Sequence, residues 1–276
     1  MSGISSSVAF SVTQIETTFA DDLGNAKGGT GSGFWLELNS GKEVFVTNRH
    51  NVDPTVLFGS DTTLKLQGLR LCLRQFERIP QSDQIRHSPG TKFFPVDDCP
   101  IYASGSSDCA IIVPQFKEDT APYEILTIIR QPDLADQTFF REKLEMMDLA
   151  SFIGFPGRRG IPWWDEVMGL PIARIASIAS YPGVDFKNRG IKTADVVLVS
   201  GLSFTGSSGS PVISHEKSIK LGKGLINPAY VPPMVIGIMS GHWWDEAETP
   251  EMFRHSGLSY LTRSTSILHL ITANNL

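Results

Sequence analysis

The hexapeptide Gly206-Ser207-Ser208-Gly209-Ser210-Pro211 decides how the rest of the chain is interpreted. The apolar run at residues 196–199 leads into it and Pro-Val-Ile leads out, which is typical of a strand, a tight loop and a second strand. The glycines let the backbone turn sharply and aim amide N–H groups at one point. A nucleophilic serine needs an exposed hydroxyl and N–H donors for the oxyanion it generates. We therefore predict that Ser208 is a nucleophile, with the amides of Gly206 and Ser208 as the oxyanion hole.

A serine in a glycine loop is also common in ordinary hairpin turns, so the prediction depends on a base and an acid elsewhere. His50 follows the apolar run at residues 43–46, and Asp108 precedes the apolar run at residues 109–112. A serine hydroxyl needs a general base, and the base needs an orienting carboxylate. The order is His…Asp…Ser, whereas an α/β-hydrolase has Ser…Asp…His. The other histidines lack a matching context, and we expect them to be surface residues: His87, His215, His242, His255 and His269.

An ordered set of further motifs surrounds these three residues. It comprises Gly31-Ser32-Gly33-Phe34, Val46-Thr47-Asn48-Arg49-His50, Asp108-Cys109-Ala110-Ile111, Ile153-Gly154-Phe155-Pro156, the segment 206–212, and Val235-Ile236-Gly237-Ile238-Met239-Ser240-Gly241. With these motifs in this order along almost the whole chain, the sequence resembles the trypsin-like serine peptidases of the chymotrypsin fold, of the bacterial type without disulfides. The resemblance implies acyl transfer through a covalent intermediate.

The strand pattern indicates an all-β fold. Short apolar runs separated by glycine and proline leave a sandwich or a barrel open. The resemblance implies two antiparallel, six-stranded-type β-barrels packed together. His50 and Asp108 would then belong to a barrel at residues 1–120, and Ser208 to a barrel at residues 148–276. A linker at 121–147 would include a helix, and a C-terminal helix is predicted over residues 264–271.

One strand carries a sign of irregularity. In residues 62–76, leucines occupy the even positions 64 and 66 and then the odd positions 69, 71 and 73. Gly68 lies where the alternation changes from even to odd positions. A slip of one residue at a glycine predicts a β-bulge, a device that bends barrel strands.

The resemblance also implies a specificity pocket with Leu202 at its floor, Ser203 beside it and Met239 in its wall. A basic P1 side chain would need a buried carboxylate as its partner, which Leu202 cannot supply. Relatives that cleave after glutamate carry a histidine where this chain has Met239. We therefore expect a small or apolar P1 residue. The edge Ser240-Gly241-His242 is expected to pair with the substrate backbone.

Composition excludes several other classes of function. The 276 residues carry 24 Lys and Arg against 29 Asp and Glu, so a nucleic-acid footprint is not indicated. No apolar run approaches the roughly 18–20 residues of a membrane span, and the N-terminus lacks the features of a secretory signal. The three cysteines cannot all pair. We expect a cytoplasmic protein, or a secreted one if a signal has already been removed, without cofactor or metal.

Two functions of different classes remain open at this level. The first is a serine endopeptidase acting on a protein or peptide. The second is a peptide-binding module on the same fold, catalytically silent or activated by a regulatory protein partner. Relatives made as zymogens place an aspartate just before the nucleophile, where this chain has Ser207. We therefore predict no activation by N-terminal cleavage.

Overall fold

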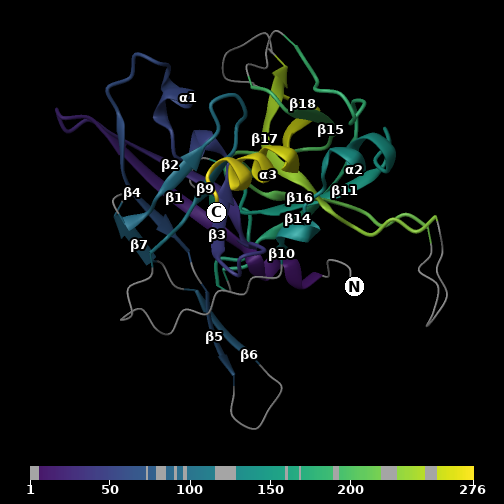
Figure 1. The fold of residues 1–276 in the computed structure, drawn as a ribbon. Helices are drawn as coiled ribbons and strands as arrows, with labels where there is room; N and C mark the ends of the chain where they lie inside the picture. Colours follow the sequence, from purple (N-terminus) through teal and green to yellow (C-terminus); the bar gives the residue numbers. More distant parts are fainter. Residues whose placement is uncertain are drawn as a thin grey trace.

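The computed structural model describes residues 6–72, 74–78, 85–89, 92–95, 98–115, 129–158, 161–167, 169–188, 193–218, 229–245 and 254–276. Two large sheets dominate this part of the chain, one built from the first half and one from the second (Figure 1). Each follows from short runs of β-branched and aromatic residues that alternate with glycine-rich turns. The all-β fold class is thereby confirmed.

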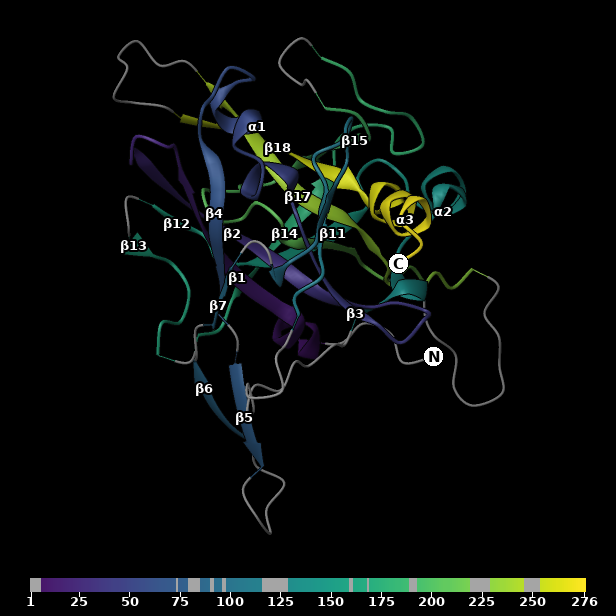
Figure 2. The same ribbon diagram turned by 60° about the vertical axis from the view of Figure 1, so that its left-hand side comes forward.

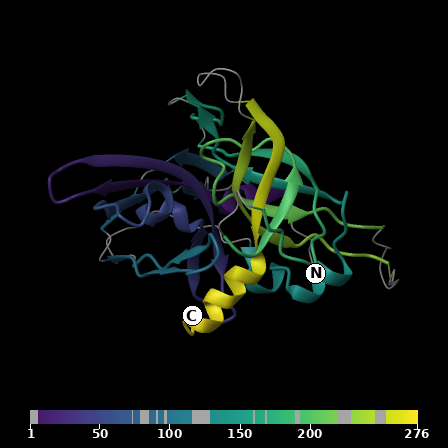
Figure 3. The ribbon, with the colours of Figure 1, turned by 90° about the horizontal axis from the view of Figure 1, so that it is seen from above.

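The first sheet is open and curled. Its order is β7-β4-β1-β2-β3-β9-β8, with β10 pairing in parallel with β2. The strands are β1 (Val12–Ala20), β2 (Ala26–Glu37), β3 (Glu43–Thr47), β4 (Lys65–Leu71), β7 (Lys92–Pro95), β8 (Ile101–Ala103), β9 (Ala110–Ile112) and β10 (Ile129–Arg130). Figure 3 shows the β1–β2 hairpin, in purple, extending away from the second sheet.

A closed first barrel was expected, and this half differs. Within the described residues no ladder joins β7 to β8, the two edge strands. Both are short and lie beside prolines, Pro95 at the end of β7 and Pro100 just before β8. Proline has no N–H to donate to a ladder and is confined to sheet edges. The β-bulge predicted near Gly68 is confirmed, because the register between β1 and β4 shifts by one residue between Leu66 and Gly68.

The second sheet closes into a six-stranded barrel in the order β11-β14-β15-β18-β17-β16. Its strands are β11 (Leu149–Gly154), β14 (Ile172–Ile178), β15 (Val196–Ser200), β16 (Pro211–Ser214), β17 (Val235–Asp245) and β18 (Arg254–Arg263). Two small hairpins lie outside both sheets: β5 (Arg74–Arg78) with β6 (Ile85–Pro89), and β12 (Gly157–Arg158) with β13 (Ile161–Pro162). The molecule is therefore a six-stranded barrel beside a curled half-barrel, a chymotrypsin-like fold.

Helical segments are short except at the C-terminus. They are η1 (Ser6–Ser11), η2 (Arg49–Asn51), α1 (Pro54–Phe58), η5 (Gln131–Asp133), α2 (Gln137–Glu142) and α3 (Ser264–Ala273). Both the linker helix and the C-terminal helix are thus present. Among the described residues, no helix has the length and apolar character that crossing a bilayer demands.

A shared hydrophobic core joins the two halves. It includes Phe34 and Val46 from the first sheet, Ile153 and Ile238 from the barrel, and Ile267 from α3, all of them buried. Figure 2 shows α3, in yellow, lying beside both halves. Burial of one such side chain contributes about 1.5–3 kcal/mol. This packing fixes the position of one half relative to the other, and with it the relative position of residues that each half supplies.

Tight packing around β2 gives a test of the fold. A Cβ at Gly33 would lie 2.3 Å from the Phe45 ring and 2.6 Å from the Val46 carbonyl oxygen. We expect Gly33→Ala to lower the free energy of unfolding by about 1–3 kcal/mol, because overpacking forces the core to shift. Gly105→Ala is the control, since no heavy atom lies within 4 Å of its Cβ position. Equal urea midpoints for the two variants would contradict this packing.

Candidate active site

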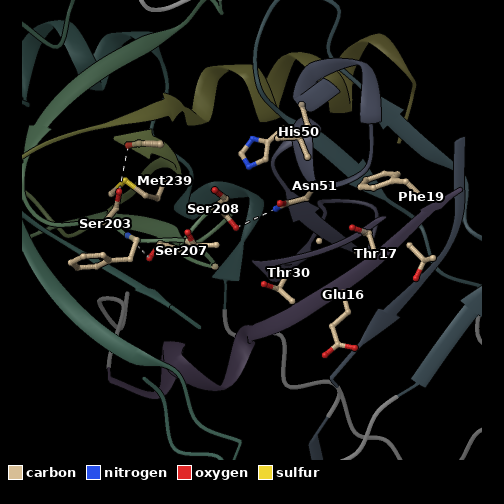
Figure 4. A pocket seen from close by; sticks show the side chains of 18 of the residues that line it. Glu16, Thr17, Phe19, Thr30, His50, Asn51, Ser203, Ser207, Ser208 and Met239 are labelled. Atoms are coloured by element: carbon tan, nitrogen blue, oxygen red, sulfur yellow. Dashed lines mark hydrogen bonds between the residues drawn. The ribbon is translucent and has the colours of Figure 1, made fainter. Parts of the chain in front are cut away.

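A cavity of about 770 Å³ opens between the two halves and is lined by several of the residues singled out in the sequence. His50 lies on η2, directly after β3, and Ser208 lies on the loop between β15 and β16. Both line this cavity, and Figure 4 shows them facing it from opposite sides. Asp108 lies just before β9, behind the His50 ring and 4% exposed. The fold thus brings together residues that are up to 158 positions apart, since 208 − 50 = 158.

Asp108 holds the His50 ring at two points. Its Oδ2 lies 2.7 Å from His50 Nδ1, and its Oδ1 accepts the His50 backbone N–H at 3.0 Å. Burial lowers the pKa of His50, but the charge of Asp108 and its hydrogen bond outweigh burial. The pKa of His50 is therefore raised above the ordinary value for histidine. This pairing leaves Nε2 as the ring nitrogen available to a substrate or nucleophile.

Hydrogen bonds to the carbonyl groups fix the orientation of the peptides that precede Ser208. The Thr205 carbonyl accepts the Gly157 N–H at 2.9 Å. Because a trans peptide directs its C=O and N–H to opposite sides, the Gly206 N–H of the same peptide faces away from Gly157. No residue that the structure describes accepts this N–H. Gly206 has φ +87°, and a Cβ there would lie 2.4 Å from the Phe155 carbonyl oxygen, so only glycine fits.

The peptide after Ser207 has the same arrangement. The Ser207 carbonyl accepts the Ser210 N–H at 3.0 Å, which directs the Ser208 N–H to the other side. That N–H also has no acceptor among the described residues. The neighbouring amides are occupied, since Ser207 N–H donates to the Phe204 carbonyl and Gly209 N–H to the Met239 carbonyl, both at 2.8 Å. Within the described residues, the loop therefore offers two N–H groups that have no acceptor, those of Gly206 and Ser208.

No hydrogen bond connects the Ser208 hydroxyl to the His50 ring among the described residues. Such contacts are often long in ligand-free sites and tighten only when substrate binds. The loop that carries Ser208 is nevertheless joined to the segment that carries His50, because the Asn51 side chain donates from Nδ2 to the Ser208 carbonyl at 3.2 Å. Figure 4 shows this contact across the cavity.

The predicted pocket residues divide into two groups. Ser203, Met239, Gly241 and His242 line the cavity together with Tyr260. Two others lie outside it. Leu202 is 50% exposed, and its carbonyl accepts a hydrogen bond from the Arg174 guanidinium at 2.8 Å. Ser240 is buried, with its hydroxyl 2.8 Å from Asn48 and 2.7 Å from Thr262.

The expectation that Leu202 lines the pocket is therefore not met, whereas its neighbour Ser203 does line the cavity. Its hydroxyl contacts Ser259 at 3.0 Å and His242 Nδ1 at 3.1 Å. His242 also departs from the expected surface position. Its ring stacks on His255 with centroids 4.6 Å apart, and burial, then His255, lowers the pKa of His242 to about 4.

Sequence reasoning missed three polar residues that connect the site. Asn48 Nδ2 donates to the Asp108 carbonyl at 2.8 Å, and Asn51 contacts Ser208 as described. Ser32, on β2, donates to the Gly206 carbonyl in the loop that carries Ser208. Ser32 and Asn48 stand inside motifs quoted from the sequence and Asn51 directly follows one, but nothing in the local pattern states which atoms they reach. Within the described residues no cluster of His, Cys, Asp and Glu could hold a metal ion.

Comparisons with known proteins were made at three levels. No family model matches the chain. No curated protein sequence matches it either. Among solved structures, the MamO protease domain from Magnetospirillum magneticum, in its apo form, is similar with a TM-score of 0.48 and 13% identity. That match covers 96% of this chain and 97% of the other. Deg5 is similar with a TM-score of 0.49 and 14% identity, over 95% of this chain and 87% of that one. The strand order of the chain itself is that of the chymotrypsin-like fold, the fold of trypsin-like serine proteases.

Proposed function

We propose that the protein is a serine endopeptidase that cleaves peptide bonds through an acyl-enzyme intermediate. The observation that carries the proposal is the pair of unpaired amides beside Ser208, opposite a histidine whose ring is held by Asp108. Preorganised N–H donors at a developing oxyanion commonly supply the largest single contribution to such a reaction. The three side chains match the roles of nucleophile, base and orienting acid.

In the first half-reaction the Ser208 oxygen attacks the scissile carbonyl carbon while His50 Nε2 takes the hydroxyl proton. The carbonyl π electrons move to oxygen, which the Gly206 and Ser208 amides bind as an oxyanion. The tetrahedral intermediate then collapses and its C–N bond breaks. His50 returns the proton to the leaving amine, and the acyl group stays on Ser208.

In the second half-reaction water replaces the amine. His50 takes a proton from water as it attacks the acyl carbon, and the same amides bind the second oxyanion. Breaking the bond to Ser208 Oγ releases the acid and returns the proton to the serine. Asp108 stays ionised throughout and stabilises the imidazolium that forms in each step.

For the substrate we propose a small or apolar P1 side chain. The end of the cavity around Met239 has no carboxylate among the lining residues, so a basic side chain would lack a charge partner there. The Ser203 hydroxyl already has protein partners in Ser259 and His242. An apolar P1 side chain would therefore leave no buried hydroxyl unsatisfied.

Cleavage of a diverse peptide library, read by mass spectrometry, tests both the reaction and the P1 preference. We expect internal cleavage sites with small or apolar residues at P1. A dominant Arg, Lys or Glu preference would contradict the specificity. Absence of any cleavage by the folded protein would contradict the endopeptidase and favour the silent binding module.

A further inference from the structure

Ser32 connects the first half of the molecule to the nucleophile loop of the second. It lies on β2 and is fully buried. Its hydroxyl donates to the Gly206 carbonyl at 2.7 Å and accepts the Phe155 N–H at 2.9 Å. Its own N–H donates to the Ser208 carbonyl at 2.7 Å, and its carbonyl accepts the Thr47 hydroxyl at 2.7 Å. Every polar group of this residue is used, and three of the four bonds cross between the halves.

The Ser32 hydroxyl binds the peptide that lies between the Gly206 and Ser208 amides. The Gly206 carbonyl belongs to the Gly206–Ser207 peptide, whose N–H donates to the Phe204 carbonyl. Ser32 therefore holds one end of this peptide and Phe204 the other. The peptides on either side carry the Gly206 and Ser208 N–H groups. Holding the central peptide limits the change in the dihedral angles on either side of it, and these angles set the direction of both N–H groups.

The position needs such an anchor because Gly206 is conformationally permissive. Its φ of +87° lies in the left-handed region, where glycine moves with little steric resistance. A buried carbonyl that loses its partner is destabilised, which favours rotation toward another donor. Among the described residues the Ser207 hydroxyl makes one hydrogen bond, accepting the Phe204 N–H at 3.3 Å. It does not reach the Gly206 carbonyl.

We propose that Ser32 is a positioning residue that holds the oxyanion hole in its binding conformation through its hydroxyl. The role rests on the proposed peptidase function and adds a residue to it. Ser32 touches neither substrate nor the reacting atoms. It acts through the Gly206 carbonyl, so its loss should weaken binding of the transition state more than binding of the substrate.

An isosteric pair of variants isolates the hydroxyl. Ser32→Thr keeps the oxygen, and Ser32→Val has nearly the same shape without it. Since both add the same bulk to a buried site, their comparison remains valid even if Ser32→Ala folds poorly. We expect kcat of the valine variant to be about 10–100-fold below that of the threonine variant, somewhat less than the loss of one oxyanion donor. KM should differ by less than about threefold.

A second readout reports the oxyanion hole directly. A peptide boronate forms a tetrahedral adduct with a serine nucleophile, and one of its oxygens occupies the oxyanion position. Its inhibition constant should rise in the valine variant by the same factor as kcat falls. A purely structural role would lower the melting temperature without this parallel change.

Ser214→Ala is the matched control. Ser214 on β16 is also buried, and its hydroxyl also accepts a backbone N–H and donates to a backbone carbonyl, both of Met234. The Ser214→Ala variant should be less stable than the wild type, with little change in kcat. Equal kcat for Ser32→Thr and Ser32→Val, in a wild type that turns over, would overturn the role of Ser32 alone. A folded wild type with no turnover would overturn the peptidase function and this role with it.

Discussion

Ser208→Ala should reduce kcat for peptide hydrolysis by about 10⁶-fold, the scale at which removal of a serine nucleophile abolishes covalent catalysis. The methyl group cannot form the acyl intermediate, so neither half-reaction proceeds through the protein. Folding should be unaffected, since no hydrogen bond of the Ser208 hydroxyl is lost among the described residues. Steady-state hydrolysis of the best library peptide, at enzyme concentrations high enough to detect residual turnover, gives the measurement.

Ser210→Ala is the control for this variant and tests the neighbouring serine as an alternative nucleophile. Ser210 is fully buried, and its hydroxyl has no hydrogen-bond partner in the part of the chain that the structure describes. Removing that hydroxyl leaves the backbone of the loop intact, so kcat should stay within about threefold of wild type. A reversed pattern, with Ser210→Ala inactive and Ser208→Ala active, would show that the nucleophile has been misassigned.

Asp108→Asn should reduce kcat by about 10⁴-fold and change the pH profile. The neutral amide cannot stabilise the imidazolium, and it allows the wrong ring tautomer. His50 must be unprotonated to act as the base, so activity rises as pH passes its pKa. Asp108 raises that pKa in the wild type, so the midpoint of the acidic limb of the pH profile lies above the ordinary pKa of histidine. Without the carboxylate, that limb should move to lower pH.

A profile of kcat/KM between about pH 5 and 9 measures the shift. Asp53→Asn serves as the control, because Asp53 pairs with Arg49 at 2.8 Å next to His50 without contacting its ring. It should leave the acidic limb in place. An unchanged limb in Asp108→Asn would contradict the assignment of Asp108 as the partner of His50.

The sequence was sufficient to place the principal elements because each has a local cause. Apolar runs bounded by glycine and proline form the strands of the closed barrel. The glycines at 206 and 209 occupy positive-φ positions that the loop requires. Gly68 marks the bulge in β4. His50 and Asp108 stand beside strand ends, where loop residues are presented to a cavity.

The remainder depends on contacts between distant residues. The exposure of Leu202 and the burial of Ser203 follow from where the loop meets β17 and β18, and local alternation carries no information on that meeting. The open edge of the first sheet depends on whether two short strands meet. Ser32 bonds to Gly206 across 174 positions, and no periodic pattern in either segment predicts such a pair.

Covalent labelling with a fluorophosphonate tests whether Ser208 is an activated nucleophile. This reagent phosphonylates a serine whose proton is taken by a neighbouring base. We expect intact-mass and peptide mapping to show one adduct, on Ser208, that is lost in Ser208→Ala and slowed in Asp108→Asn. A folded wild-type protein that takes no label, or takes it on another serine, would contradict the account.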